Sequence, residues 1–121
     1  MAQTFTVTGK LAIPLEEGGS VAPIDLGVSL VILNRADFGR SYAGAVTDDA
    51  VNLGTLTSNG AKGILVKCTS GSCTVKFNAG ATAWPLAVGG YFLWVNPSTA
   101  FATAALVTTS GPATVVFLAV G

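Results

Sequence analysis

Residues 64–77 contain two alternating apolar-polar segments around a short turn, and this pattern constrains the fold more than any other part of the sequence. The segment reads ILVKCTSGSCTVKF, with Ser70 and Gly71 at its centre. Glycine tolerates the positive φ of a two-residue turn, so we predict a β-hairpin with Ser70-Gly71 at its tip. Side chains alternate between the two faces of a strand, which gives this hairpin one apolar face and one wet face. The apolar face holds Ile64, Val66, Cys68, Cys73, Val75 and Phe77, and the wet face holds Leu65, Lys67, Thr74 and Lys76.

Short alternating segments of this kind recur along the chain between Gly, Pro and Asn turns. They predict an all-β fold, an antiparallel, jelly-roll-like β-sandwich with about eight short strands. The length is that of a single domain, residues 1–121, in which residues 1–20 are interpreted as an N-terminal arm. Residues 34–49 are the least regular stretch and are predicted to form a loop with room for one helical turn.

One internal similarity links the predicted hairpin to the end of the chain. A shift of 40 residues places Thr69-Ser70-Gly71 over Thr109-Ser110-Gly111. The similarity predicts two similar turns in one sandwich. It is compatible both with a duplication and with independent use of a common turn sequence, because one such match is too little for a repeat architecture.

Charge is scarce and unevenly distributed. Charged residues make up 10% of the chain, with a net charge of zero, whereas a typical domain has about 25%. All six acids precede Ala50, and no side chain from Phe77 to Gly121 is charged. A soluble monomer rarely leaves such a long segment uncharged, so we expect this segment to be covered by a partner.

The sequence offers little catalytic chemistry. It contains no histidine, which removes the commonest general base and metal ligand, and it has no phosphate-binding loop or dinucleotide fingerprint. Asp37, Asp48 and Asp49 match no calcium-loop spacing and are interpreted as solvated carboxylates. We therefore expect neither an enzyme nor a cofactor or metal site.

Cys68 and Cys73 form the sharpest local pair. The predicted register places them directly opposite each other, at a distance that permits a disulfide. Two reduced, buried thiols that pack as small apolar groups are the preferred interpretation, with a disulfide as the alternative. Two cysteines alone make only half of a metal site.

The aromatic residues are interpreted mainly as core or interface. Trp84, Tyr91 and Trp94 could in principle stack on a sugar, but Tyr91 and Trp94 point to opposite faces of one strand. This opposition weakens the sugar-platform interpretation.

Targeting and partner signals are also few. The first residues lack a basic segment followed by a long apolar one, and no apolar run approaches the ~18 residues of a membrane helix. There is no basic patch for nucleic acid. We expect synthesis in a cytoplasm and neither nucleic-acid nor membrane partners.

Several segments together resemble a known group of proteins. These are residues 63–68 (GILVKC), 74–77 (TVKF), 84–94 (WPLAVGGYFLW) and 113–117 (ATVVF). They look like small β-sandwich virion proteins of tailed bacteriophages, including head decoration (cement) proteins with jelly-roll-like folds, over residues 50–121. The resemblance implies a virion location and a homo-oligomer, often a trimer, that binds the major capsid protein and stabilises the lattice. The alternative is a tail, fibre or baseplate module, with host glycans as its ligand.

The uncharged segment then predicts the contact surface. Exposed apolar strands without charges are prone to edge-to-edge pairing, and subunit contacts would protect them. The residues we expect in this interface are Tyr91, Trp94, Val115 and Phe117.

Overall fold

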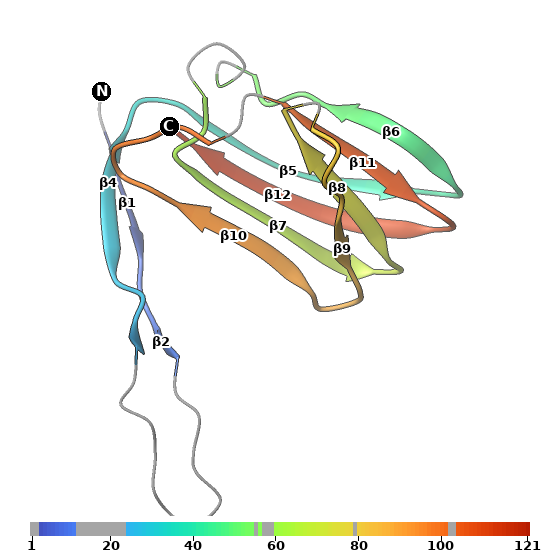
Figure 1. Ribbon diagram of the computed structural model, residues 1–121, viewed down its shortest axis with the longest axis horizontal. Helices are drawn as coiled ribbons and strands as arrows, with labels where there is room; N and C mark the ends of the chain where they lie inside the picture. The colour runs from blue at the N-terminus through green and yellow to red at the C-terminus, as the bar shows by residue number, and fades with distance from the viewer. Residues whose placement is uncertain (1–2, 12–23, 55, 57–59, 79, 102–103) are drawn as a thin grey trace, which may run out of the picture.

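The computed structural model describes residues 3–11, 24–54, 56, 60–78, 80–101 and 104–121, and its described residues form twelve β-strands. Eight of these strands build two four-stranded antiparallel sheets (Figure 1). Sheet 1 has the order β10-β7-β12-β5, from Tyr91–Val95, Gly63–Ser70, Ala113–Val120 and Arg35–Tyr42. Sheet 2 has the order β6-β11-β8-β9, from Val46–Val51, Ala105–Thr109, Cys73–Phe77 and Trp84–Leu86.

The strand pairing is nested. Antiparallel pairs form between β5 and β12, β6 and β11, β7 and β10, and β8 and β9. The chain therefore runs outward through β5 to β8 and returns through β9 to β12, and this long hairpin is folded across two sheets. This arrangement is a jelly roll, and it confirms the predicted all-β, jelly-roll-like sandwich.

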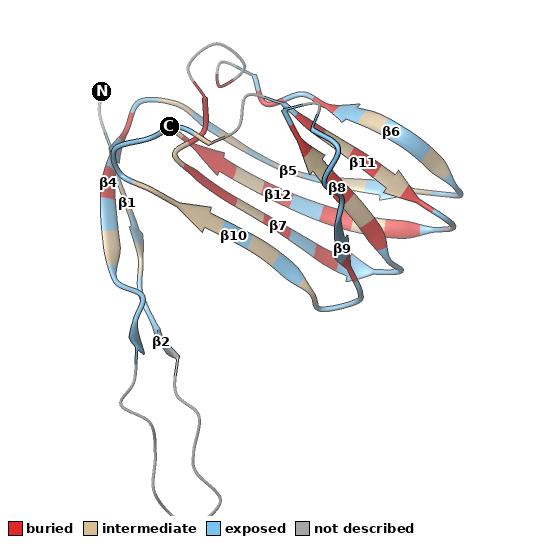
Figure 2. Ribbon diagram, in the orientation of Figure 1, coloured by how far each residue is buried: buried red, intermediate tan, exposed pale blue. Residues whose placement is uncertain are grey.

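The inner faces of both sheets form the core. Buried residues concentrate on the central strands β7, β12, β8 and β11 (Figure 2). On β12, the inward residues Val115 and Phe117 are completely buried, while Val116 between them points outward and is 39% exposed. This alternation is the period of two that a half-buried strand requires.

The predicted hairpin at Ser70-Gly71 is wrong in its pairing. All six residues assigned to its apolar face are buried, but β7 and β8 belong to different sheets. The chain at residues 70–72 is a corner that crosses from sheet 1 to sheet 2. A corner and a hairpin bury the same alternate residues, so the hydrophobic pattern could not distinguish them.

Residues 34–49, predicted as a loop, instead contain β5 and the start of β6. Burial alternates along all of β5, so that Ala36 and Phe38 face the core. Phe38 stacks on Phe117 with ring centroids 5.4 Å apart. The apolar-polar alternation of β5 is not evident in the sequence, because the charged residue Arg40 also occupies an inward position, opposite Val115.

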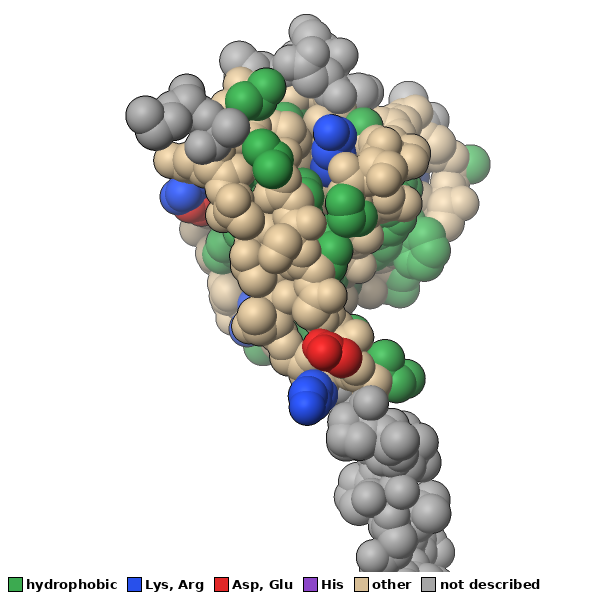
Figure 3. All heavy atoms as spheres, turned by 90° about the vertical axis from the view of Figure 1, so that its left-hand side faces the viewer, with side chains coloured by type: hydrophobic (Ala, Val, Ile, Leu, Met, Phe, Trp, Pro, Cys, Tyr) green, Lys and Arg blue, Asp and Glu red, His purple; other side chains and the backbone are tan. Residues whose placement is uncertain are grey.

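The remaining strands form a two-stranded ribbon. β1 (Gln3–Val7) pairs with β4 (Val28–Ile32), and β2 (Lys10–Leu11) pairs with β3 (Ile24–Asp25). At the ribbon's base, Leu30 and Ile32 pack on Val120, on the outer face of sheet 1. The ribbon projects away from the sandwich (Figures 1 and 3). Of the arm predicted at residues 1–20, residues 3–11 form one side of this ribbon, and residues 12–23 lie outside the described residues.

Candidate interaction surface

The edges of the two sheets meet along two sides of the sandwich, and different kinds of side chain join them on each side. On the β5/β6 side, Arg40 donates a hydrogen bond to the carboxylate of Asp49 at 2.6 Å, and Tyr42 Oη donates to the same oxygen at 2.9 Å. This network joins sheet 1 to sheet 2. Nothing in the sequence indicates this network, because Arg40 and Asp49 meet only when β5 joins sheet 1 and β6 joins sheet 2.

Electrostatics in this network favour the charged pair. The hydrogen bonds from Tyr42 and Arg40 lower the pKa of Asp49 below its ordinary value. Partial burial, with the bond to Asp49, raises the pKa of Tyr42. Nearby, Lys76 pairs with Asp48 at 3.3 Å. The predicted solvated carboxylates thus belong to strands and carry ion pairs, and the described residues contain no group of three potential metal ligands.

On the β9/β10 side, aromatic rings replace charges. Phe77 lies 4.9 Å from Phe92 and 5.2 Å from Phe101, and Trp84 lies 5.5 Å from Phe92, measured between ring centroids. Trp94 stacks on Phe101 at 4.7 Å. This aromatic cluster fills the space between the edges of the two sheets without any charged group.

The predicted interface residues are separated by the fold. Tyr91 is 60% exposed on the outer face of sheet 1, and its neighbour Leu93 is 40% exposed. Trp94 belongs to the inward aromatic cluster, so Tyr91 and Trp94 do point apart. Val115 and Phe117 are fully buried on the central strand β12, and the assignment of these two residues to an interface is therefore wrong. An uncharged segment signals core as readily as contact surface, which explains the error.

A groove runs between the ribbon and the outer face of sheet 1. It has a volume of about 470 Å³ and is lined by apolar side chains of both, including Phe5, Val7, Leu65, Leu93 and Leu118. Thr6, Thr8, Lys67 and Tyr91 complete its wall. Tyr91 and Leu93 therefore border both this groove and the free edge of sheet 1.

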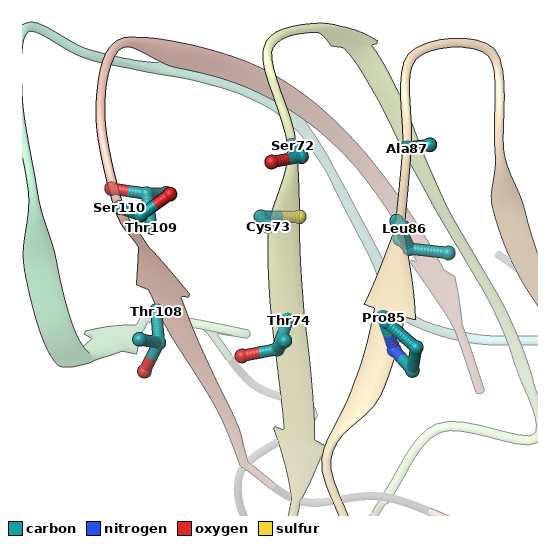
Figure 4. A pocket seen from close by; sticks show the side chains of 9 residues that line it. All are labelled: Ser72, Cys73, Thr74, Pro85, Leu86, Ala87, Thr108, Thr109 and Ser110. Atoms are coloured by element: carbon teal, nitrogen blue, oxygen red, sulfur yellow. The ribbon is translucent and has the colours of Figure 1, made fainter.

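A second hollow lies across β11, β8 and β9, at the end of sheet 2 where β8 begins (Figure 4). Its volume is about 360 Å³, and its polar side chains are the thiol of Cys73 and the hydroxyls of Ser72, Thr74, Thr108, Thr109 and Ser110. Figure 4 shows these hydroxyls on β8, β11 and the residues next to them, and the lining includes no carboxylate or amine. Without a base beside a hydroxyl, nucleophilic activation lacks its usual partner.

Cys68 and Cys73 are both buried and free. Their burial agrees with the prediction, but they do not form a cross-strand pair, since β7 and β8 lie in different sheets. The Cys68 thiol donates to the carbonyl oxygens of Ser70 and Gly71 at 3.2 and 3.4 Å. Burial, with the neighbouring Cys68, raises the pKa of Cys73 to about 11. A thiol with a raised pKa is a poor nucleophile at neutral pH.

No helix among the described residues has the length and apolarity needed to cross a membrane.

Comparisons with known proteins do not place this chain in a family. No family model matches the sequence, and no curated protein matches it. A solved structure that it resembles is the cupin domain of Cnp3 from Schizosaccharomyces pombe, at 11% identity and a TM-score of 0.45. The match covers 95% of this chain and 83% of that one.

Proposed function

We propose that this protein is a structural protein of a tailed-phage virion, a decoration (cement) protein that binds the major capsid protein and contacts copies of itself. The observation that carries this proposal is the contrast between the two sides of the sandwich. Charged groups pair with one another across the β5/β6 side, whereas the β9/β10 side exposes Trp84, Tyr91 and Leu93 with no charge among them.

Three further features support a binding role over a catalytic one. The sequence contains no histidine, and the thiol of Cys73 is buried with its pKa raised to about 11. The groove beside the ribbon is lined mainly by apolar side chains, and Lys67 is the one charged residue in its lining. Jelly rolls serve in capsid and lectin domains among others, so the fold alone does not decide among these roles.

The proposed location is the virion, after synthesis in the host cytoplasm. The partners are the major capsid protein and other copies of this chain, and the number of copies in contact depends on which surface they share. Neither a cofactor nor a nucleic acid takes part in this proposal.

The test uses phage heads from which the gene for this chain has been deleted. Purified protein is mixed with these heads, which are then sedimented, and the bound protein is quantified. We expect saturable binding at a fixed ratio to the major capsid protein and increased resistance of the heads to heat or chelators. Heads that already carry the chain serve as the control, because their sites are filled.

Absence of saturable binding to the deleted heads would contradict the proposal. Binding to host cells or purified host glycans, without binding to heads, would instead support the tail, fibre or baseplate alternative.

A further inference from the structure

The four edge strands of the sandwich differ in how they are protected from pairing with other chains. β5 carries Arg35, Asp37 and Arg40, and β6 carries Asp48 and Asp49. β9 has only three residues, and one of them is Pro85. Charges, short length and proline are the usual protections of an edge strand. β10, with the sequence YFLWV, has neither a charge nor a proline.

The backbone of β10 offers unused hydrogen-bonding groups along this edge. Hydrogen bonds run from Cys68 N to Gly90 O and from Asn96 N to Lys62 O, at the two ends of the β10/β7 pair. These bonds show which residues of β10 direct their backbone groups to β7. Bonded positions alternate in an antiparallel ladder, so Phe92 and Trp94 direct their backbone groups to β7. The N–H and C=O groups of Tyr91, Leu93 and Val95 point away from β7, and no backbone hydrogen bond joins them to another described residue.

We propose that two copies of this chain pair through β10, antiparallel and about a two-fold axis at Leu93, so that sheet 1 continues into the partner. In this register Leu93 lies opposite Leu93 of the partner subunit, and Tyr91 lies opposite the partner's Val95. All three outward donors and all three outward acceptors of each β10 are then bonded. An isologous contact of this kind is closed and does not propagate.

The side chains fit the same register. On the outer face, Tyr91, Leu93 and Val95 of both copies form one apolar row, because they alternate with the inward residues. On the inner face, Phe92 lies opposite the partner's Trp94, which extends the aromatic cluster across the axis. Aromatic and branched cross-strand pairs stabilise antiparallel sheets, and no like charges meet here.

The ribbon lies over one face of sheet 1, whereas the pairing groups of β10 lie in the plane of the sheet. It packs on the outer face of sheet 1, where its residues 25–28 border a hollow with the side chains of Leu93 and Val95. The pairing groups of β10 point along the plane of the sheet, away from β7.

This inference deepens the self-association part of the proposed function and is independent of capsid binding. It gives a dimer, whereas the phage resemblance implies a trimer. A trimer whose mass is unaffected by changes in β10 would contradict the inference and leave the capsid proposal standing. A protein that dimerises through β10 but does not bind phage heads would contradict the capsid proposal and support the inference.

The experiment is a charge-complementation test at residue 93. The full chain is compared with Leu93→Lys and Leu93→Asp by sedimentation equilibrium at micromolar concentration. Each variant alone places like charges opposite each other at the axis, and we expect roughly tenfold or greater weakening of the dimer. An equimolar mixture of the two variants should restore a dimer containing one copy of each.

The matched control makes the same changes at Val116, which lies on the same outer face but on the central strand β12. Val116→Lys and Val116→Asp should leave the dimer unchanged. A further variant, Leu93→Pro, removes an outward donor that β7 does not use, so it should give a folded monomer, checked by circular dichroism. A monomeric wild-type chain, or a dimer that tolerates both Leu93 variants alone, would overturn the inference.

Discussion

At the scale of single residues, inward and outward positions on β12 contribute very differently. Phe117 is fully buried and stacks on Phe38, whereas Val116 next to it is exposed. Phe117→Ala should reduce the free energy of unfolding by about 3–5 kcal/mol, because it removes a large buried ring and leaves a cavity. Val116→Ala should cost less than about 1 kcal/mol. Urea denaturation of both variants checks this, and equal losses would contradict the placement of β12.

The buried thiol of Cys73 should make the free energy of unfolding decrease at alkaline pH. Its folded pKa of about 11 lies above the ordinary value of 9.0, so the folded state favours the neutral thiol. This contribution is complete below pH 9 and is lost as the pH rises through 11, at no more than about 1.4 kcal/mol per pH unit. Cys73→Val should flatten that part of the profile. Denaturation between pH 8 and 11 tests it, and identical slopes for both proteins would contradict it.

Which residues face the core could be predicted from the sequence, because burial follows the alternation of side chains along a strand. The six apolar positions from Ile64 to Phe77 are buried as predicted. The partner across the sheet could not be predicted in the same way. Val115 and Phe117 belong to a strand without charges, and such a sequence is compatible with either an edge strand or a central strand of a sheet. The strand is central because β7 and β5 pair with it on its two sides.

At the scale of elements, the decisive feature is the corner at residues 70–72. Gly71 has a φ of +69°, as the hairpin prediction required, but the turn serves to cross between sheets. The corner between β11 and β12 lies against it, since a Cβ on Gly71 would be 2.2 Å from the carbonyl oxygen of Pro112. The two Thr-Ser-Gly turns of the internal similarity are thus neighbouring corners of the same kind.

This packing gives a matched pair of glycine variants. Gly71→Ala should destabilise the fold by about 1–3 kcal/mol or more, through a positive φ and a backbone clash. Gly111→Ala, at the equivalent turn, meets no atom within 4 Å and should have little effect. Thermal denaturation of the two variants measures the difference. Equal behaviour would mean that the two corners do not meet.

At the scale of the whole molecule, the edge strands on one side of the jelly roll carry charges, and those on the other side carry none. The network of Arg40, Tyr42 and Asp49 closes the β5/β6 side, and aromatic rings close the β9/β10 side. The sequence predicts an uncharged contact region, and within it we propose the edge of β10 as the surface that pairs with a second copy. We propose that this molecule works by assembly through that edge.

Amide hydrogen exchange along β10, followed by NMR at low and high protein concentration, tests this claim most directly. Phe92 and Trp94 donate to β7, so their amides should be protected at both concentrations. The amides of Tyr91, Leu93 and Val95 should exchange rapidly in dilute protein and become protected as copies pair. Rapid exchange of these three amides at every concentration, with mass fixed at that of one chain, would contradict the account.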